Sequence, residues 1–422
     1  MGIKPSDLGA LPPDWKAVKF GAITKVRQGL QIAISERLTK PTLTSQEYIT
    51  IQSINRQNQE REYVESPSAR VTCKSDDVLM TRTGNTGIVV TGVEGAFHNN
   101  FFLIDFDRKQ LDSIFLVNYL RSPRVQHVLL TKAGASTIPD LNHKDFYSID
   151  LPLAPLTEQK KIAQILSTWD KAISTTEQLL ANSQQQKKAL MQQLLTGPHP
   201  SKPRLLDKNG VRFSGEWEAT TLGELGSTYS GLTGKTKDDF GKGKPYIPYI
   251  NIFRNSRIDL DAVEKVDIAS DEKQASVRYG DIFFTTSSEV PEEVGMSSVL
   301  LDHVEELYLN SFCFGFRLNS FEALQPEYAR YLFRSEQVRR AISVMGQGAT
   351  RYNLSKKQLM KLELILPPIA EQQKIAAVLS TADQEISALQ QQLDHLKQEK
   401  KALMQQLLTG KRRVKIEGVG NA

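Results

Sequence analysis

The chain has 422 residues, of which 40% are hydrophobic and 24% charged, and its formal net charge is +5. This length and composition predict two or three folded domains and argue against a largely disordered chain. Cys73 and Cys313 are too few for a disulfide framework or a cysteine zinc site. The sequence shows neither a signal-peptide pattern nor a run of about 18 apolar residues. We therefore expect a cytoplasmic protein whose mild positive charge permits nucleic-acid binding without requiring it.

The chain is an internal duplication. Residues 187–197 and 400–410 both read KKALMQQLLTG, and a shift of 213 residues makes 25 of the 41 residues in 157–197 match those in 370–410. Toward the start of each half only the hydrophobic pattern is kept. The predicted parts are a variable domain at 1–150, a helix at 151–197, a linker at 198–215, a second variable domain at 216–365, a second helix at 366–410 and a basic tail at 411–422.

Both variable domains are predicted to combine strands with short helices, an α+β arrangement. Runs of alternating apolar residues predict the strands, and turn residues between these runs mark where each strand ends. In the first domain we expect strands at 48–54, 77–81, 86–91 and 100–106 and helical spacing at 112–131. In the second domain we expect strands at 246–252, 281–285 and 307–317 and helical spacing at 325–344.

The loops between these strands hold side chains that suit base edges, since Arg and Lys pair well with guanine and Asn and Gln with adenine. The loops differ between the two domains while the flanking strands agree, which predicts two different targets. The candidate DNA-binding residues are Arg27, Gln28, Gln31, Gln52, Asn55, Arg56, Arg82, Asn85, Thr86, Tyr229, Ser230, Lys235, Thr236, Asn251, Arg254, Asn255, Ser287, Ser288 and Arg351.

Each half ends in a long predicted helix with a heptad pattern. Each helix follows a proline, Pro155 or Pro368, and should stop at a left-handed glycine, Gly197 or Gly410. A lone helix of this length would expose an apolar stripe, so we expect an antiparallel coiled coil within the chain, with a homodimeric coiled coil as the alternative. The predicted seam residues are Ile162, Leu166, Trp169, Ile173, Leu180, Leu190, Leu194, Ile375, Leu379, Ile386, Leu389, Leu393, Leu396, Leu403 and Leu407.

The two helix starts carry a shared signature. Residues 155–173 read PLTEQKKIAQILSTWDKAI and residues 368–386 read PIAEQQKIAAVLSTADQEI. In this duplicated form, and with two variable domains that alternate with the two copies, the chain resembles the specificity subunit of type I restriction-modification systems. The resemblance implies two α/β target-recognition domains, each reading one half of a bipartite asymmetric DNA site, and paired helices that act as a spacer. It also implies two partner methyltransferase subunits that modify adenine, and restriction subunits that act as translocases; S-adenosylmethionine, ATP and Mg²⁺ would bind those partners, and none would bind this chain.

Two other classes of protein stay open. A duplicated coiled-coil scaffold would bind proteins in place of DNA. A metal-dependent nuclease would use Asp77, Asp107 and Lys109. The segment 229–236 approaches a phosphate-binding loop but has Tyr229 at the first glycine position. The favoured prediction is a non-catalytic DNA-binding subunit without a metal site.

Overall fold

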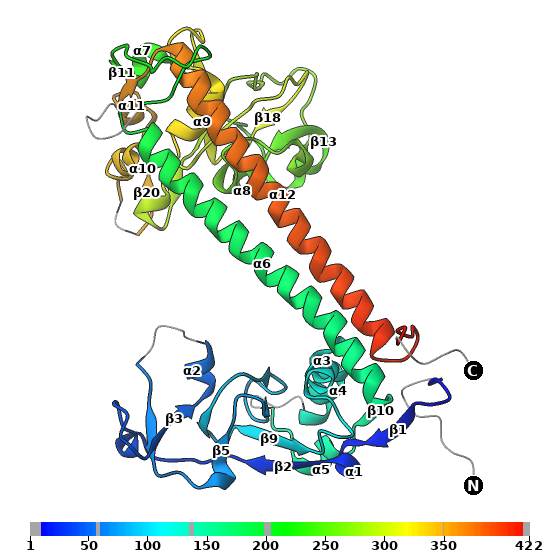
Figure 1. Cartoon of the computed structure of the whole chain (residues 1–422). Helices are drawn as coiled ribbons and strands as arrows, with labels where there is room; N and C mark the ends of the chain where they lie inside the picture. The colour runs from blue at the N-terminus through cyan, green and yellow to red at the C-terminus, as the bar shows by residue number, and fades with distance from the viewer. Residues whose placement is uncertain (1–9, 56–59, 135–138, 198–203, 349, 417–422) are drawn as a thin grey trace. The chain divides into compact units, whose positions relative to one another are not determined.

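The computed structural model describes residues 10–55, 60–134, 139–197, 204–348 and 350–416. The chain divides into two units (Figure 1). The first unit comprises Met1–Glu177 and Gln391–Ala422, and the second comprises Gln178–Gln390. Each of the long helices α6 (Leu156–Leu194) and α12 (Ile369–Leu407) therefore contributes one part to each unit.

In the described part of the first unit, the strands form two four-stranded sheets and a separate pair. The first sheet is antiparallel and has the order β2 (Thr24–Gln28), β9 (Phe101–Phe106), β6 (Val78–Thr81), β7 (Val89–Val90). The second sheet has the order β4 (Tyr63–Glu65), β3 (Ser45–Ile49), β8 (Gly95–Phe97), β5 (Thr72–Cys73). The pair joins β1 (Lys16–Lys19) to β10 (Asp150–Leu153), which brings the start of the domain beside its end.

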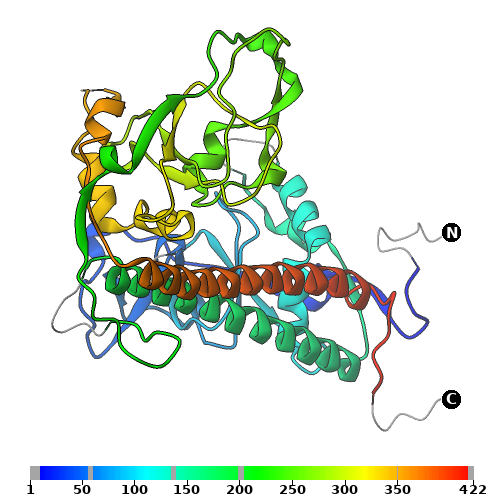
Figure 2. The ribbon, with the colours of Figure 1, turned by 90° about the horizontal axis from the view of Figure 1, so that it is seen from above.

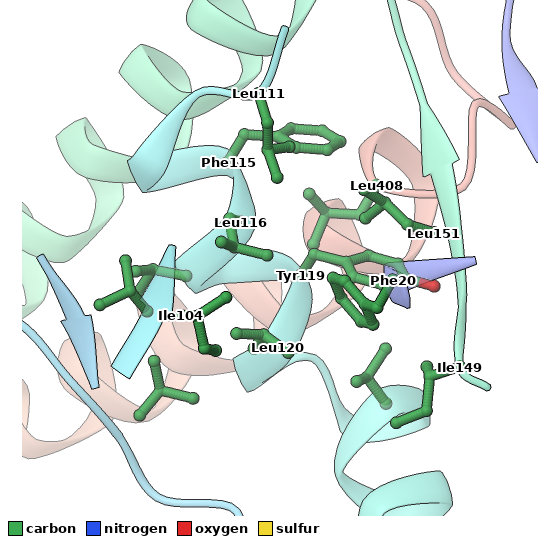
Figure 3. Packing of buried hydrophobic residues seen from close by; sticks show 14 of the residues in the cluster. Phe20, Ile104, Leu111, Phe115, Leu116, Tyr119, Leu120, Ile149, Leu151 and Leu408 are labelled. Carbon is green, nitrogen blue, oxygen red and sulfur yellow. The ribbon is translucent and has the colours of Figure 1, made fainter. Parts of the chain in front are cut away.

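Five short α-helices belong to the described part of this unit: α1 (Phe20–Ile23), α2 (Ile51–Asn55), α3 (Ser113–Arg121), α4 (Pro123–Ala133) and α5 (His143–Tyr147). Helix α2 lies beside β3 of the second sheet, and the other four contribute to the core of the first (Figure 1). Phe115, Leu116, Tyr119 and Leu120 of α3 are buried, and their helical spacing places them on one face. Figure 3 shows this face beside Phe20 and beside Leu408, which follows α12. Residues from both ends of the chain therefore share one hydrophobic core.

The second unit repeats this architecture. Its antiparallel sheet has the order β12 (Gly226–Ser230), β19 (Cys313–Leu318), β15 (Ile282–Thr285), β17 (Ser297–Val299). A second sheet has β13 (Phe240–Ile247) at its centre, between β14 (Glu264–Val266) and β18 (Tyr308–Leu309). Two further pairs join β11 (Glu218–Thr221) to β21 (Glu363–Leu366) and β16 (Ser287–Ser288) to β20 (Tyr352–Asn353). The helices are α7 (Leu222–Leu225), α8 (Tyr249–Arg254), α9 (Pro326–Leu332), α10 (Glu336–Ser343) and α11 (Lys356–Leu359). The matching strand order confirms the predicted α+β duplication.

Within each unit, a part of α6 lies beside a part of α12 (Figure 2). Polar pairs cross the seam in the first unit between Asp170 and Lys400 and between Glu177 and Lys397, and in the second between Ser183 and Glu385 and between Lys187 and Asp383. Residue numbers rise on one helix as they fall on the other, so the helices are antiparallel. Each predicted seam residue is buried or partly buried. The antiparallel pairing predicted within the chain is confirmed, and Gly197 and Gly410 have the predicted positive φ, at 87° and 72°.

The strand predicted at 48–54 is wrong beyond Ile49, where β3 ends and α2 begins. Thr50 and Ser53 exchange hydrogen bonds between backbone N–H groups and hydroxyls at 2.9 and 3.1 Å, which starts the helix. The prediction at 246–252 is wrong in the same way, because β13 ends before Pro248 and α8 follows. Short apolar runs do not by themselves distinguish strand from helix.

Other predicted elements were too long. The helical span 112–131 is two helices, because Pro123 starts α4 directly after the bend at Ser122. The span 325–344 is likewise divided at Ser335, whose side chain caps α10. The strand predicted at 86–91 reduces to β7, and the one at 307–317 is divided into β18 and β19. Among the described residues, no helix has the length and apolar character that crossing a bilayer needs.

The Glu–Gln pair of the shared signature anchors each long helix to its domain. In the first unit, buried Glu158 accepts a hydrogen bond from Trp15 Nε1 at 2.9 Å, and Gln159 Oε1 accepts one from the backbone N–H of Asp112 at 2.9 Å. In the second unit the corresponding bonds run from Trp217 Nε1 to Glu371 at 3.2 Å and from the N–H of Gln325 to Gln372 at 2.9 Å. Sequence reasoning recognised this signature but missed its structural role.

Candidate nucleic-acid interface

The loop 82–88 between β6 and β7 carries three of the predicted DNA-binding residues. Arg82 Nη2 donates to both carboxylate oxygens of Asp140 at 2.8 Å. A hydrogen bond from the Thr83 hydroxyl lowers the pKa of Asp140 below its usual value, and Arg82 lowers it further. Thr86 is buried, and its hydroxyl lies 2.9 Å from the carbonyls of Arg82 and Pro139, so the structure gives it a structural role. Asn85 is exposed at the tip, which leaves it the most accessible of the predicted readers in this loop.

The predicted residues at the end of β2 are partly engaged. Arg27 pairs with Asp105 of the neighbouring strand β9 at 2.7 Å and also donates to the carbonyls of Ala69 and Arg70. Gln28 is exposed, and Gln31 Oε1 accepts a hydrogen bond from Asn99 Nδ2 at 2.7 Å. Arg27 is therefore fixed in place while Gln28 faces solvent.

A polar pocket of about 790 Å³ lies beside α2 in the same unit. Gln52 lines it together with Arg37, Tyr48, His98 and Asn100. Burial lowers the pKa of His98, which favours its neutral form. Asn55 is the last residue of α2, and Arg56 lies outside the described residues.

In the second unit, the prediction for Tyr229 is corrected by its surroundings. Its hydroxyl donates to Asp281 Oδ2 at 2.6 Å, and Arg317 pairs with the same carboxylate at 2.6 Å. Burial, followed by the Asp281 charge, raises the pKa of Tyr229. This cluster ties β12, β15 and β19 together, so Tyr229 has a structural role. Ser230 is exposed and accepts a hydrogen bond from Lys356 Nζ at 2.7 Å.

The segment resembling a phosphate-binding loop has a different structure from that motif. Lys235 is largely buried and pairs with Glu272, while Thr236 caps the short 3₁₀ turn Lys237–Asp239. The chain then continues directly into strand β13. A phosphate-binding loop needs a helix at this point, so the geometry speaks against that alternative.

Helix α8 and Asn255, the residue that follows it, give the three predicted residues of this segment different roles. Asn251 is buried, and its amide donates to the carbonyls of Asp259 and Ala262 at 2.7 and 3.1 Å. It shapes the loop and does not face solvent, which corrects its prediction as a base reader. Asn255 is half-buried and donates to Asn251 Oδ1, whereas Arg254 is exposed and lines a polar pocket of about 550 Å³.

Ser287, Ser288 and Arg351 are brought together by the pairing of β16 with β20. Arg351 Nε donates to Ser287 Oγ at 3.2 Å, and Ser288 lies opposite Tyr352. Ser288 is buried, with its hydroxyl 3.3 Å from Glu293 Oε2. Ser287 and Arg351 therefore form one candidate contact surface. Whether any of the accessible residues contacts a base stays a prediction.

The residues of the nuclease alternative are engaged with their neighbours. Asp77 pairs with Arg108 at 3.1 Å, and Asp107 accepts a hydrogen bond from the backbone N–H of Lys109 at 2.9 Å. Among the residues that the structure describes, no group of three or more His, Cys, Asp or Glu side chains is placed to hold a metal ion.

Comparison with known proteins gives one consistent picture. The family model for the type I restriction modification DNA specificity domain matches residues 12–182 and 214–398. The MjaVIII specificity subunit of Methanocaldococcus jannaschii is 25% identical over 424 residues, which covers 96% of this chain and 94% of that protein. The EcoKI specificity subunit of Escherichia coli is 24% identical over 275 residues, 63% of this chain and 58% of that protein.

Solved structures share the fold. The S subunit of a type I restriction-modification system from M. genitalium has a TM-score of 0.55 at 14% identity, covering 96% of this chain and 98% of that one. A chain from a study of assembly and conformational transition of a type I system has a TM-score of 0.58 at 19% identity, covering 96% and 100%. The chain therefore belongs to the type I restriction modification DNA specificity domain family, with one copy of the domain in each half.

Proposed function

We propose that this chain is the DNA-specificity subunit of a type I restriction-modification complex, that each domain reads one half of a bipartite DNA site, and that the paired helices act as the spacer. One observation carries the proposal. The two domains share a strand order but differ in the side chains of the matching loops. Directly after the matched Thr81 and Thr285, for example, the first domain has Arg82 and the second has Thr286. A shared fold that carries two different sets of loop side chains is suited to reading two different short DNA sequences.

Joining two readers in one chain has a physical advantage. A short half-site offers few base contacts and therefore limited discrimination. Once one domain is bound, binding of the other becomes intramolecular and occurs at high effective concentration. Lys and Arg contacts to phosphates add affinity that depends on salt but not on sequence.

The proposal also assigns the chemistry to partners. The names of the relatives describe specificity subunits of restriction enzymes, which implies that double-stranded DNA is bound here and that other subunits act on it. Two methyltransferase subunits with S-adenosylmethionine and restriction–translocase subunits with ATP and Mg²⁺ would supply modification and cleavage. This chain itself would be non-catalytic and without a cofactor.

The test is selection by the purified full-length chain from a library of randomised duplex DNA, followed by binding measurements at several salt concentrations. The expected result is one enriched bipartite sequence, with an affinity whose logarithm falls by about 0.9 per phosphate contact for each tenfold rise in salt. Failure to enrich any sequence would favour the scaffold alternative. Cleavage of DNA by the isolated chain with added Mg²⁺ would favour the nuclease alternative.

A further inference from the structure

In the first unit, two side chains from the helical layer hold the hairpin loop that follows β6. Gln126 of α4 donates through Nε2 to the carbonyl of Gly87 at 2.8 Å and to that of Leu120 at 2.7 Å. Arg121, the last residue of α3, donates through Nη2 to the carbonyl of Val89 at 2.8 Å. The held carbonyls lie two residues apart at the end of the loop 82–88.

The same arrangement recurs in the second unit. With the shift of 213 residues, Arg121 corresponds to Arg334 and Gln126 to Arg339. Arg334 Nε donates to the carbonyl of Ser297 at 2.7 Å, and Arg339 Nη1 donates to that of Gly295. These carbonyls are again two residues apart, so the second unit has the same contacts with arginine in place of glutamine.

The registers of the two hairpins confirm that the contacts correspond. Thr81 Oγ1 accepts a hydrogen bond from the N–H of Ile88 at 2.9 Å, and Thr285 Oγ1 accepts one from the N–H of Met296 at 2.9 Å. Ile88 lies between the two held carbonyls of the first hairpin, and Met296 lies between those of the second. The clamp, defined as Arg121 and Gln126 in one unit and Arg334 and Arg339 in the other, is therefore duplicated.

The second unit extends the clamp to a further loop. Arg334 Nη2 donates to the carbonyls of Ile252, Phe253 and Asn255 at 2.7, 3.1 and 2.9 Å. These residues flank the exposed Arg254 at the end of α8. One guanidinium thus joins the hairpin loop of the second domain to the C-terminal end of α8, where Arg254 lies.

The choice of side chain is unusual for packing alone. Apart from a 4.0 Å contact to Met296 Sδ, the hydrogen bonds that Arg334 and Arg339 donate to described residues all end on backbone carbonyls. Burial lowers the pKa of both to about 10. Burying a guanidinium costs free energy that an apolar side chain of similar size would avoid. What the guanidinium provides instead is several donors in a fixed plane, which set the positions of several carbonyls at once.

We propose that the clamp side chains are positioning residues for base recognition. Each fixes the hairpin loop of its own domain, and Arg334 fixes in addition the end of α8 that carries Arg254. The inference rests on the proposed function and deepens it, since it assigns specificity to side chains beneath the reading loops. Small displacements matter here because a hydrogen bond to a base edge weakens steeply outside its narrow range of distance and angle.

The chain supplies its own matched variants. Arg339→Met removes the donors with little change in length, whereas Arg339→Gln installs the residue that the first domain uses at this place. Gln126→Ala removes the donor in the first domain. The controls are exposed neighbours, Arg340→Met and His127→Ala. Each variant is made in the full-length chain, and its sequence preference is measured by the same selection from randomised duplexes.

The expected result is a loss of discrimination confined to one half-site. Arg339→Met should lower the preference for the cognate bases of one half-site roughly ten-fold, about the effect of losing one base contact. Gln126→Ala should do the same at the other half-site, and each unaffected half serves as an internal control. Arg339→Gln should retain more of the preference than Arg339→Met, and the two exposed controls should match the unaltered chain.

A second readout separates positioning from general stability. Amide hydrogen exchange in the hairpin should rise in Arg339→Met while exchange in α6 and α12 stays unchanged. Equal loss at both half-sites, or unchanged preferences at both, would overturn the positioning role. If the unaltered chain enriches no sequence, the proposed function itself fails. That outcome differs from one in which the unaltered chain enriches a sequence and the variants enrich it equally well, which refutes only the positioning role. Should Arg339→Met not fold, Arg339→Gln and Gln126→Ala still decide the question.

Discussion

Replacement of Arg413 by methionine tests how the segment after α12 is held in the first unit. Arg413 donates to both oxygens of Glu158 at 2.7 and 2.8 Å and to both oxygens of Asp14 at 2.8 Å. Glu158 is fully buried, and Trp15 Nε1 is its one further side-chain donor in the part of the chain that the structure describes. The variant removes two charge-assisted hydrogen bonds from a carboxylate that has few other partners.

The magnitude follows from burial. Breaking a fully buried ion pair costs about 3–5 kcal/mol because one charge is left without compensation. The Arg413 side chain is 44% exposed, so water can reach the vacated place, and we expect about 2 kcal/mol. That corresponds to a fall of about 4–8 °C in the melting temperature of a unit of this size. In the second unit, Arg204 holds Glu371 with only 16% of its side chain exposed, so Arg204→Met should cost more than Arg413→Met.

Differential scanning calorimetry of the full-length chain measures this effect. The matched control is Arg412→Met, which removes the same charge from an exposed neighbour and should change the stability by less than about 0.5 kcal/mol. Equal melting temperatures for the two variants would refute the reasoning, since the loss would then reflect net charge and not the bonds to Glu158.

Further variants test the seam and the first reading loop. Leu166→Asp and Leu393→Asp each place a charge at a buried seam position, so each should cost at least about 3 kcal/mol in urea unfolding, and unchanged midpoints would contradict the seam. Arg82→Ala should relax sequence selection at one half-site only, and equal loss at both would contradict the model of two readers. The pKa of Asp140 is lowered by Thr83 and Arg82, so its contribution to stability is complete above its unfolded pKa near 3.8 and is lost as the pH falls through the lower folded pKa. In Asp140→Asn, the free energy of unfolding should depend less on pH in that acid range. An unchanged pH dependence would contradict a stabilising role for the Asp140 carboxylate.

The long helices were the most predictable part of the fold. Apolar residues at heptad spacing determine which face is buried, and an equal partner in the same chain makes intrachain pairing favourable. Even the polar seam positions Ser183 and Lys187 find partners across the seam, in Glu385 and Asp383. Local pattern and tertiary packing agree here, so the sequence alone was sufficient.

The candidate interface was less predictable, because the same residue types serve as readers and as structural supports. Tyr229 looked like a loop residue suited to DNA, yet its hydroxyl is engaged inside the domain by Asp281, which is distant in sequence. Such pairings depend on tertiary packing and carry no local signal. The clamp arginine Arg339 was missed for the same reason, although its fixed offset from Gln126 was visible in the duplicated alignment.

The measurement that tests the central claim most directly is long-read mapping of modified adenine in the DNA of cells that express this gene together with its methyltransferase subunits, with and without the gene. The account predicts that methylation at one bipartite motif is present with the gene and disappears without it. Motif methylation that persists unchanged after deletion would contradict the assignment of this chain as the subunit that reads the site.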